Sequence, residues 1–297
     1  MLNRGYPYTT LITSRHRGQT VLEHLSTHHP HSTLEAWQQN LANREVTLNG
    51  IPACGTEPLI PGQTLTWNRP PWHEPATPQH FETLFDDPHI LAVNKPSGLP
   101  TLPGAGFLEN TLLSLVQCQH PNANPVHRLG RTTSGIVLFA KSPQAARTLT
   151  AAWNTPQIPK IYRALAAGVA THQTYEILTP IGQVPHPLLG RVWAAHPAGK
   201  PSKSVAQVLT RTRDTTLFEV ALYSGRPHQI RIHLASIGHP LLGDPLFGPN
   251  GLPLADSPGV PGDGGYLLHA HILRFTHPIT GQQLTLEAPI PPSLQLE

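Results

Sequence analysis

Apolar side chains near the start of the chain recur at the three- and four-residue spacing of a helix. Leu22 and Leu25 form one such pair, and Leu34, Trp37 and Leu41 form a second, longer stripe. Residues with this spacing share one face of a helix, so the stripes indicate helices that pack on a core. The pattern predicts two short helices in succession.

A start signal and a hairpin signal frame the second of these helices. Ser32 and Glu35 have the spacing of a capping box, in which two side chains bind the backbone of the first helical turn. After the helix, residues 46–48 alternate into Asn49-Gly50, a strong signal for a tight hairpin turn. This order predicts a small first domain that covers residues 1–67.

Short apolar runs typical of strands dominate the rest of the chain. A proline-rich segment, residues 68–80, precedes them and is expected to be a stiff, extended linker. The strand-like runs lie at residues 90–93, 136–140, 161–165, 205–209 and 217–222. Because few long helical stretches separate them, we expect an α+β fold with a mixed or antiparallel central sheet over residues 81–297.

Positive charge is concentrated in one block of the chain. The net charge is only +3, yet residues 126–233 contain 13 Lys and Arg against Glu176, Asp214 and Glu219, a local balance of +10. The remainder holds 7 basic and 14 acidic residues, a balance of −7. A block of one sign is expected of a surface that binds a phosphate backbone, so the charge favours a nucleic acid as partner.

Other partners receive less support. Apolar runs stay below the ~20 residues that a membrane-spanning helix needs, and the N-terminus lacks the apolar core of a signal peptide, so we expect a cytoplasmic protein with no membrane partner. Among the 19 histidines, His28, His29 and His31 are the most clustered. They flank Pro30 in an expected turn without an ordered ligand frame, so we expect a solvated polar tip, no metal and no cofactor.

Residues 127–141, HRLGRTTSGIVLFAK, resemble the signature loop of the RluA family of RNA pseudouridine synthases. In that family the loop reads His-Arg-Leu-Asp-x-x-Thr-Ser-Gly, and its Asp is the essential catalytic group. Here the Asp position is Gly130, which offers neither a nucleophile nor a base. From residue 110 to residue 175 there is no Asp or Glu, so a shifted alignment does not restore the carboxylate.

A second stretch, residues 224–248, matches the family's Gly-Arg-x-His-Gln-Ile-Arg-x-His block almost residue for residue. Pro227 is suited to open a helix here, which would place Arg226 at a helix N-terminus, a position that favours an anion. The resemblance implies that Arg226 pairs with the catalytic carboxylate and holds it ionised and oriented. With Gly130 in the Asp position, Arg226 is left for a phosphate, a water or another carboxylate.

The resemblance also implies an RNA-binding surface. Tyr162 lies in a segment like the family's Lys-x-Tyr-x-Ala strand, and we expect its ring to stack on an extruded uracil, although such a tyrosine taken alone is more often a core residue. The implied RNA contacts are Arg128, Arg131, Lys160, Lys200, His228, Gln229 and Arg231.

The first domain resembles the alpha-L RNA-binding motif that often precedes this catalytic domain, but Arg44 is nearly the only basic residue near its second helix, so RNA binding and simple packing both stay open. For the whole protein the resemblance implies a monomeric isomerase that converts uridine to pseudouridine in a structured RNA, rRNA or tRNA. The alternative is a catalytically inactive RNA-binding protein, a pseudoenzyme, because of Gly130. A structural protein that has also lost RNA binding is disfavoured by the retained Arg226, Lys160 and Tyr162.

Overall fold

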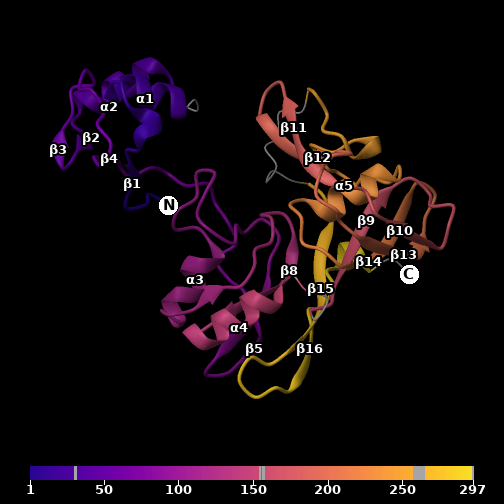
Figure 1. Cartoon of the computed structure of the whole chain (residues 1–297). Helices are drawn as coiled ribbons and strands as arrows, with labels where there is room; N and C mark the ends of the chain where they lie inside the picture. Colours follow the sequence, from indigo (N-terminus) through magenta and orange to yellow (C-terminus); the bar gives the residue numbers. More distant parts are fainter. Residues whose placement is uncertain (30–31, 154, 156–157, 257–264, 296–297) are drawn as a thin grey trace. The chain divides into compact units, whose positions relative to one another are not determined.

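The computed structural model describes the chain except for residues 30–31, 154, 156–157, 257–264 and 296–297. The chain divides into two compact units, Met1–Pro75 and Ala76–Glu297 (Figure 1). The division falls inside the segment expected to be a linker, residues 68–80. Asn68 and Arg69, at the start of that segment, instead continue the last strand of the first unit.

The Met1–Pro75 unit packs helices against one antiparallel sheet, in the strand order β1-β4-β2-β3. Its elements are β1 (Tyr6–Leu11), the 3₁₀ helix η1 (Ser14–His16), α1 (Val21–His28), α2 (Leu34–Ala42), β2 (Val46–Leu48), β3 (Ile51–Pro52) and β4 (Thr64–Arg69). Leu25, Trp37 and Leu41 are buried in one core with Leu65 of β4. Of the two apolar stripes, these three members therefore face the sheet.

The caps of the two helices differ from the expected ones. Ser32 and Glu35 do not form a capping box; Thr33 is the N-cap of α2, and its side chain accepts from the backbone N–H of Ala36 at 3.2 Å. A capping box is present at α1, where Thr20 and Glu23 bind each other's backbone N–H groups. The predicted cap was therefore wrong by one residue.

A large mixed sheet forms the Ala76–Glu297 unit and confirms the predicted α+β fold. Its strands are β5 (Glu82–Asp86), β6 (Ile90–Lys95), β7 (Asn124–Pro125), β8 (Ser134–Ala140), β9 (Lys160–Ala167), β10 (Thr174–Ile177), β13 (Ser204–Arg211), β14 (Thr215–Leu222), β15 (Leu268–Thr276) and β16 (Gln283–Glu287). The order is β10-β13-β14-β9-β15-β8-β6-β5, with β16 on β15 and β7 on β8. The pair β15–β8 is parallel and the other pairs are antiparallel.

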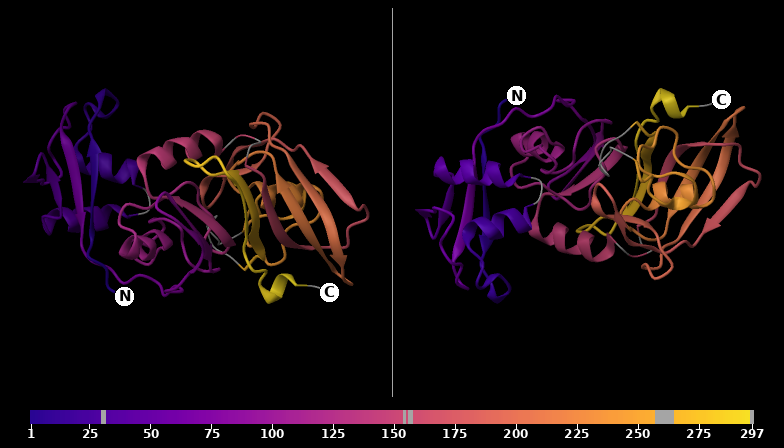
Figure 2. Two further views of the ribbon diagram at one scale, coloured as in Figure 1. Left: turned by 90° about the horizontal axis from the view of Figure 1, so that it is seen from below. Right: turned by 90° about the horizontal axis from the view of Figure 1, so that it is seen from above.

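Helices α3 (Leu112–Gln119) and α4 (Pro143–Trp153) lie on opposite sides of β6 and β8 (Figure 2). Successive side chains of a strand point to opposite faces, so Leu91 and Val137 pack with Leu112 of α3, whereas Leu138 packs with Leu149 of α4. No helix in the part of the chain that the structure describes is long and apolar enough to cross a membrane.

Helix α5 (Gln229–Ser236) lies between the sheet and a separate hairpin of β11 (Ile181–His186) and β12 (Gly190–Ala195). Ile230 and Leu234 pack with Phe218 of the sheet, whereas Ile232 packs with Ile181 of the hairpin. Because layers cover α5 on both sides, its polar residues are buried and must find hydrogen-bond partners inside the protein. The 3₁₀ helices η2 (Pro249–Gly251) and η3 (Pro292–Leu294) complete the unit.

Candidate active site

The loop of residues 128–133 lies between β7 and β8, and a buried lysine binds it. The ammonium of Lys95, at the end of β6, donates to the carbonyl oxygens of Pro96, Leu99 and Arg131 at 2.9, 2.7 and 3.0 Å. Lys95 is completely buried, and burial lowers its pKa to about 7. Because an ammonium has three N–H groups, these acceptors satisfy all of them and make Lys95 a rigid cross-link.

The segment after Lys95 adds two hydrogen bonds to the loop. Ser97 Oγ donates to the carbonyl oxygen of Thr132 at 2.6 Å. The backbone N–H of Gly98 donates to the carbonyl oxygen of Arg131 at 2.9 Å. Both acceptors are backbone carbonyl groups of the loop. These two hydrogen bonds therefore hold the backbone of the loop in place without involving its side chains.

Leu129 holds the other end of the loop. Thr101 Oγ1 donates to the carbonyl oxygen of Leu129 at 2.9 Å and accepts from its N–H at 3.2 Å. The Leu129 side chain is buried in an apolar cluster against which the half-buried ring of Tyr162 packs. The tyrosine expected to stack on uracil therefore belongs to the cluster that supports the loop.

Gly135, just after the loop, marks a close approach of β8 to β15. A Cβ on Gly135 would lie 2.2 Å from the carbonyl oxygen of Ala270, and the residue has φ +105°. Beside it, Ser134 Oγ lies 2.9 Å from Nδ1 of His269 on β15. Position 135 therefore requires glycine both for space and for backbone conformation.

Gly130 is exposed, and its backbone does not lie in the left-handed region that favours glycine. A Cβ built there would lie 3.0 Å from Oη of Tyr266 and 3.6 Å from Oγ1 of Thr133. Tyr266 Oη is also 3.4 Å from Thr133 Oγ1. The hydroxyl of Tyr266 therefore stands against the space that a side chain at position 130 would enter.

A buried ion pair contacts the ring of the same tyrosine. Arg231 Nε and Nη2 donate to the two carboxylate oxygens of Asp244, each at 2.7 Å, and the exposed fractions of the two side chains are 2% and 1%. The guanidinium carbon lies 4.4 Å from the ring centroid of Tyr266 and 4.8 Å from that of Phe247. Tyr266 thus connects the cation to Gly130.

The start of α5 differs from the one predicted. The helix begins at Gln229 and follows His228, whose φ of 56° is left-handed, so Pro227 does not open it. Arg226 therefore precedes the helix by more than one residue, and its Nε donates to the carbonyl oxygen of Pro201 at 3.2 Å. The expectation that Arg226 stands at the helix N-terminus was wrong.

Arg231, and not Arg226, is the arginine that the contacts connect to position 130. It reaches that position through the ring of Tyr266, whereas the hydrogen bonds described for Arg226 lead to Pro201 and to α5. Arg231 was expected to bind RNA. Because Arg231 is buried and donates two hydrogen bonds to the Asp244 carboxylate, it forms an ion pair inside the protein instead.

His228 lies beside the same arginine. Burial lowers its pKa to about 4, with further lowering by Arg231 and Arg128, and Asp244 opposes the shift. Its Nδ1 lies 3.4 Å from Nη1 of Arg231. The imidazole is therefore neutral near pH 7. The charge of the exposed Arg128 acts on the His228 ring, as the charge of Arg231 does.

Gln229 and Lys160, two further predicted RNA contacts, serve the interior. The Gln229 amide donates to Ser204 Oγ and to the carbonyl oxygen of Lys203, both at 2.9 Å. Lys160 is 8% exposed. Its ammonium donates to the carbonyl oxygen of Trp153 at 2.5 Å and lies 4.5 Å from the centroid of the Trp153 ring. Burial lowers the pKa of Lys160 to about 8. Neither side chain is placed to meet a phosphate.

An open cleft of about 320 Å³ runs along the loop. Its lining residues are Ser97, Gly98, Arg131, Thr132, Gly265, Tyr266 and Leu267. The cleft brings the half-buried cation Arg131 and the aromatic residue Tyr266 to one surface. Lys200 and Arg128 are exposed, as a contact with RNA requires.

Tyr162 lines a separate cavity of about 10 Å³ together with His127, Trp153 and Lys160. That volume is about one water-sized sphere, so a nucleobase does not enter it in this conformation. Burial raises the pKa of Tyr162 to about 12, and burial lowers that of His127 to about 3. Stacking of Tyr162 on uracil stays a prediction, and it requires the surrounding side chains to move.

Lys95, Asp244 and Tyr266 were not predicted as site residues. Lys95 and Asp244 stand in the segments Asn-Lys-Pro-x-Gly and Gly-Asp-Pro-x-x-Gly, so motif comparison offered a signal for both. Tyr266 stands in no such segment. Only the fold brings it to Thr133, from which 133 positions of sequence separate it.

The cross-linked loop lies in a stretch of the chain that matches a known protein family. Residues 89–236 match the family model described as RNA pseudouridylate synthase. The chain is 41% identical over 276 residues to an uncharacterized RNA pseudouridine synthase of Synechocystis sp.. The aligned region covers 92% of this chain and 95% of the relative. The chain therefore belongs to the RNA pseudouridine synthase family, and the predicted RluA-type membership is confirmed.

Relatives from other organisms agree with this assignment. RNA pseudouridine synthase 5 of Arabidopsis thaliana is 36% identical over 350 residues, covering 99% of this chain and 95% of that protein. Ribosomal large subunit pseudouridine synthase D of Neisseria meningitidis is 34% identical over 288 residues, covering 93% and 76%. The solved structure of human RNA pseudouridylate synthase domain containing 1 has a TM-score of 0.57 at 22% identity, covering 75% of this chain and 89% of that one, which shows a shared fold.

Proposed function

We propose that this protein converts uridine to pseudouridine in a structured RNA, either ribosomal or transfer RNA, as a cytoplasmic monomer. The observation that carries the proposal is the 41% identity over 92% of the chain to an RNA pseudouridine synthase. The reaction breaks the bond between ribose C1′ and uracil N1 and forms a bond from C1′ to uracil C5. Because the product is an isomer of the substrate, no cofactor has to supply atoms or electrons.

The exposed cations near the loop support binding of RNA. Arg128 and Lys200 are exposed and Arg131 lines the cleft, so all three are proposed to contact phosphates. Tyr162 keeps its proposed role of stacking on the extruded base.

The reaction needs a group that acts on the ribose, and Gly130 supplies none. Asp244 is nearby in the network, but its oxygens already accept from Arg231 and from the backbone N–H groups of Leu246 and Phe247. The hydroxyl of Tyr266 stands 3.0 Å from the place of a Cβ at position 130, and Tyr266 is one of the residues that line the cleft. We therefore propose that Tyr266 takes the part of the missing carboxylate.

In this scheme the phenol oxygen of Tyr266 attacks C1′ while its proton passes to the departing uracil, so a C1′–O bond forms as the C1′–N1 bond breaks. The base then turns, C5 attacks C1′, the C1′–O bond breaks, and the C5 proton returns to the phenol oxygen. Tyrosine acts as a nucleophile at a sugar in sialidases. The Arg231 guanidinium over the Tyr266 ring stabilises the negative charge that develops on the oxygen as the C1′–O bond breaks, before the C5 proton returns to it.

The test is a pseudouridine assay on total RNA from cells that lack this protein. Purified protein is added to the RNA, and carbodiimide labelling followed by primer extension maps the product. We expect new stops at a small set of uridines that are absent without the protein. If the protein binds RNA but no uridine is converted, the isomerase proposal fails and the binding-only alternative replaces it.

A further inference from the structure

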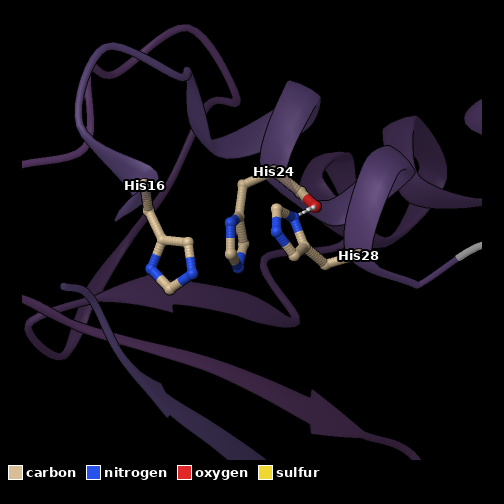
Figure 3. A group of neighbouring side chains, drawn as sticks. All are labelled: His16, His24 and His28. Carbon is tan, nitrogen blue, oxygen red and sulfur yellow. Dashed lines mark hydrogen bonds between the residues drawn. The ribbon is translucent and has the colours of Figure 1, made fainter. Parts of the chain in front are cut away.

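Three histidine side chains converge in the Met1–Pro75 unit, which contains none of the residues of the candidate active site. His16 comes from η1, and His24 and His28 come from α1 (Figure 3). One nitrogen of each ring lies within 4.8 Å of one nitrogen of each of the others. His24 is buried, His16 is half-buried and His28 is exposed, so the group reaches from the core to the surface.

Two of the three histidines are four residues apart on one helix. This spacing places both side chains on one face of α1, as in the helical His pairs that bind zinc. Their rings lie almost parallel, with centroids 4.3 Å apart at an interplanar angle of 24° (Figure 3). The ring of His16 approaches them edge-on, at 4.8 Å from His24 and 5.2 Å from His28.

Hydrogen bonds of the α1 pair leave one nitrogen of each ring ready for a metal. His28 Nδ1 lies 3.1 Å from the carbonyl oxygen of His24, which only accepts, so this nitrogen carries the proton and Nε2 keeps its lone pair. His24 Nδ1 lies 3.3 Å from Oε1 of Gln19, with the same consequence. Carbonyl acceptors behind the ring are the usual outer shell of metal-bound histidines.

His16 is the ligand that has to turn. Its Nδ1 accepts from the backbone N–H of Thr13 at 3.2 Å and lies 3.5 Å from Thr13 Oγ1, and both contacts are long. Tetrahedral zinc with bonds of about 2.0–2.1 Å holds its nitrogen ligands about 3.4 Å apart. The ligand nitrogens must therefore approach one another by at most about 1.4 Å from the 4.8 Å limit, and the proposal requires the side chains to turn by that amount.

We propose that His16, His24 and His28 form a binding site for one transition-metal ion of the class that prefers imidazole, with Zn²⁺ as the expected ion and water in the fourth position. The ion joins η1 to α1 and so links the connection after β1 to the first helix. A unit of this size gains much of its stability from such cross-links. The expectation of no metal rested on His28, His29 and His31; His31 lies outside the described residues, and His28 instead faces His16 and His24.

Isothermal titration of the full-length, untagged protein with ZnCl₂ tests the site. We expect one ion per chain with micromolar or tighter affinity, and a melting temperature that rises with zinc. His28→Gln is the main variant, because His28 is exposed and its replacement leaves the core intact. We expect it to weaken binding at least about tenfold, the scale on which metal sites respond to lost partners.

His80→Gln is the matched control, because His80 is exposed and belongs to the Ala76–Glu297 unit; its zinc affinity should equal that of the natural protein. His16→Gln should behave as His28→Gln does, since it removes the third ligand. If His28→Gln or His16→Gln binds zinc as the natural protein does, the ion lies elsewhere and the proposal is overturned. An absence of binding to the natural protein overturns it as well. Neither result depends on pseudouridine formation.

Discussion

Replacing Tyr266 by Phe removes one oxygen atom and keeps the surrounding packing. The ring is 3% exposed, and its contact with the Arg231 guanidinium at 4.4 Å remains. The lost hydrogen bond to Thr133 is 3.4 Å long, so we expect the free energy of unfolding to fall by no more than about 0.5–1.5 kcal/mol. If the oxygen is the nucleophile, the rate of pseudouridine formation should fall by about 10³-fold or more.

Single-turnover kinetics with saturating RNA measure this rate separately from binding. Filter binding of the same RNA and thermal melting by circular dichroism show whether affinity and folding are kept. Tyr175→Phe is the matched control, because Tyr175 Oη accepts from the backbone N–H groups of Thr171 and His172 at 3.0 Å each and so has a structural role. We expect this variant to lose stability while its rate stays unchanged.

A second substitution sharpens the test. In the Tyr266→Phe protein, Gly130→Asp no longer meets the hydroxyl that lies 3.0 Å from the new Cβ, so the carboxylate has room and should restore part of the rate. Gly130→Asp alone must displace that hydroxyl and should slow the natural protein. If Tyr266→Phe keeps its rate to within a factor of about 10, equal to about 1.4 kcal/mol of barrier, the hydroxyl is not the reagent and the scheme is refuted.

Further predictions concern the interior and the RNA surface. Arg231→Met should destabilise the protein by about 3–5 kcal/mol in urea unfolding because it leaves Asp244 as a buried, unpaired charge, and Arg231→Met/Asp244→Leu should recover much of the loss; equal stability of the two variants would contradict this. Burial lowers the pKa of His233 and of His269 from 6.5 to about 4. Between these two pH values, both histidines are protonated in the unfolded chain and neutral in the folded protein. The free energy of unfolding measured in urea should therefore be highest above about pH 6.5 and fall as the pH drops toward about 4, by up to ~1.4 kcal/mol per pH unit for each histidine, and a flat profile would exclude this role. Tyr162→Ala should weaken RNA binding by about 1–3 kcal/mol in filter assays and also lower the melting temperature, because the ring packs against the cluster around Leu129; early melting with unchanged affinity would make Tyr162 a core residue only.

The elements that the sequence predicted correctly are those whose signal is local. The stripe of Trp37 and Leu41 became the buried face of α2, and the apolar run of residues 136–140 became β8. β1 was not predicted, because it is a strand only through its backbone pairing with β4, which lies more than fifty positions later in the chain. Spacing along the sequence carries no information about such a partner.

The site could be predicted in its motifs but not in its geometry. Motif comparison identified the loop around Gly130, and the family resemblance implied that Arg226 pairs with the catalytic position in it. Pro227 was separately expected to open α5 and so to place Arg226 at a helix N-terminus. The left-handed His228 delays the helix to Gln229. Arg231 then takes the inward position, because α5 is enclosed by the sheet and by the hairpin. That enclosure is a tertiary fact and leaves no trace in the residues of α5 alone.

The hydrogen bonds of the loop separate positioning from chemistry. Lys95, Ser97 and Gly98 all bind backbone carbonyl groups of the loop, and none of these bonds involves the side chain at position 130. Gly130 also does not need glycine for its own backbone. A change at position 130 therefore leaves the course of the loop as it is and alters only what stands opposite Tyr266. For this reason the pair of substitutions at positions 130 and 266 reports on the reagent of the reaction rather than on the stability of the fold.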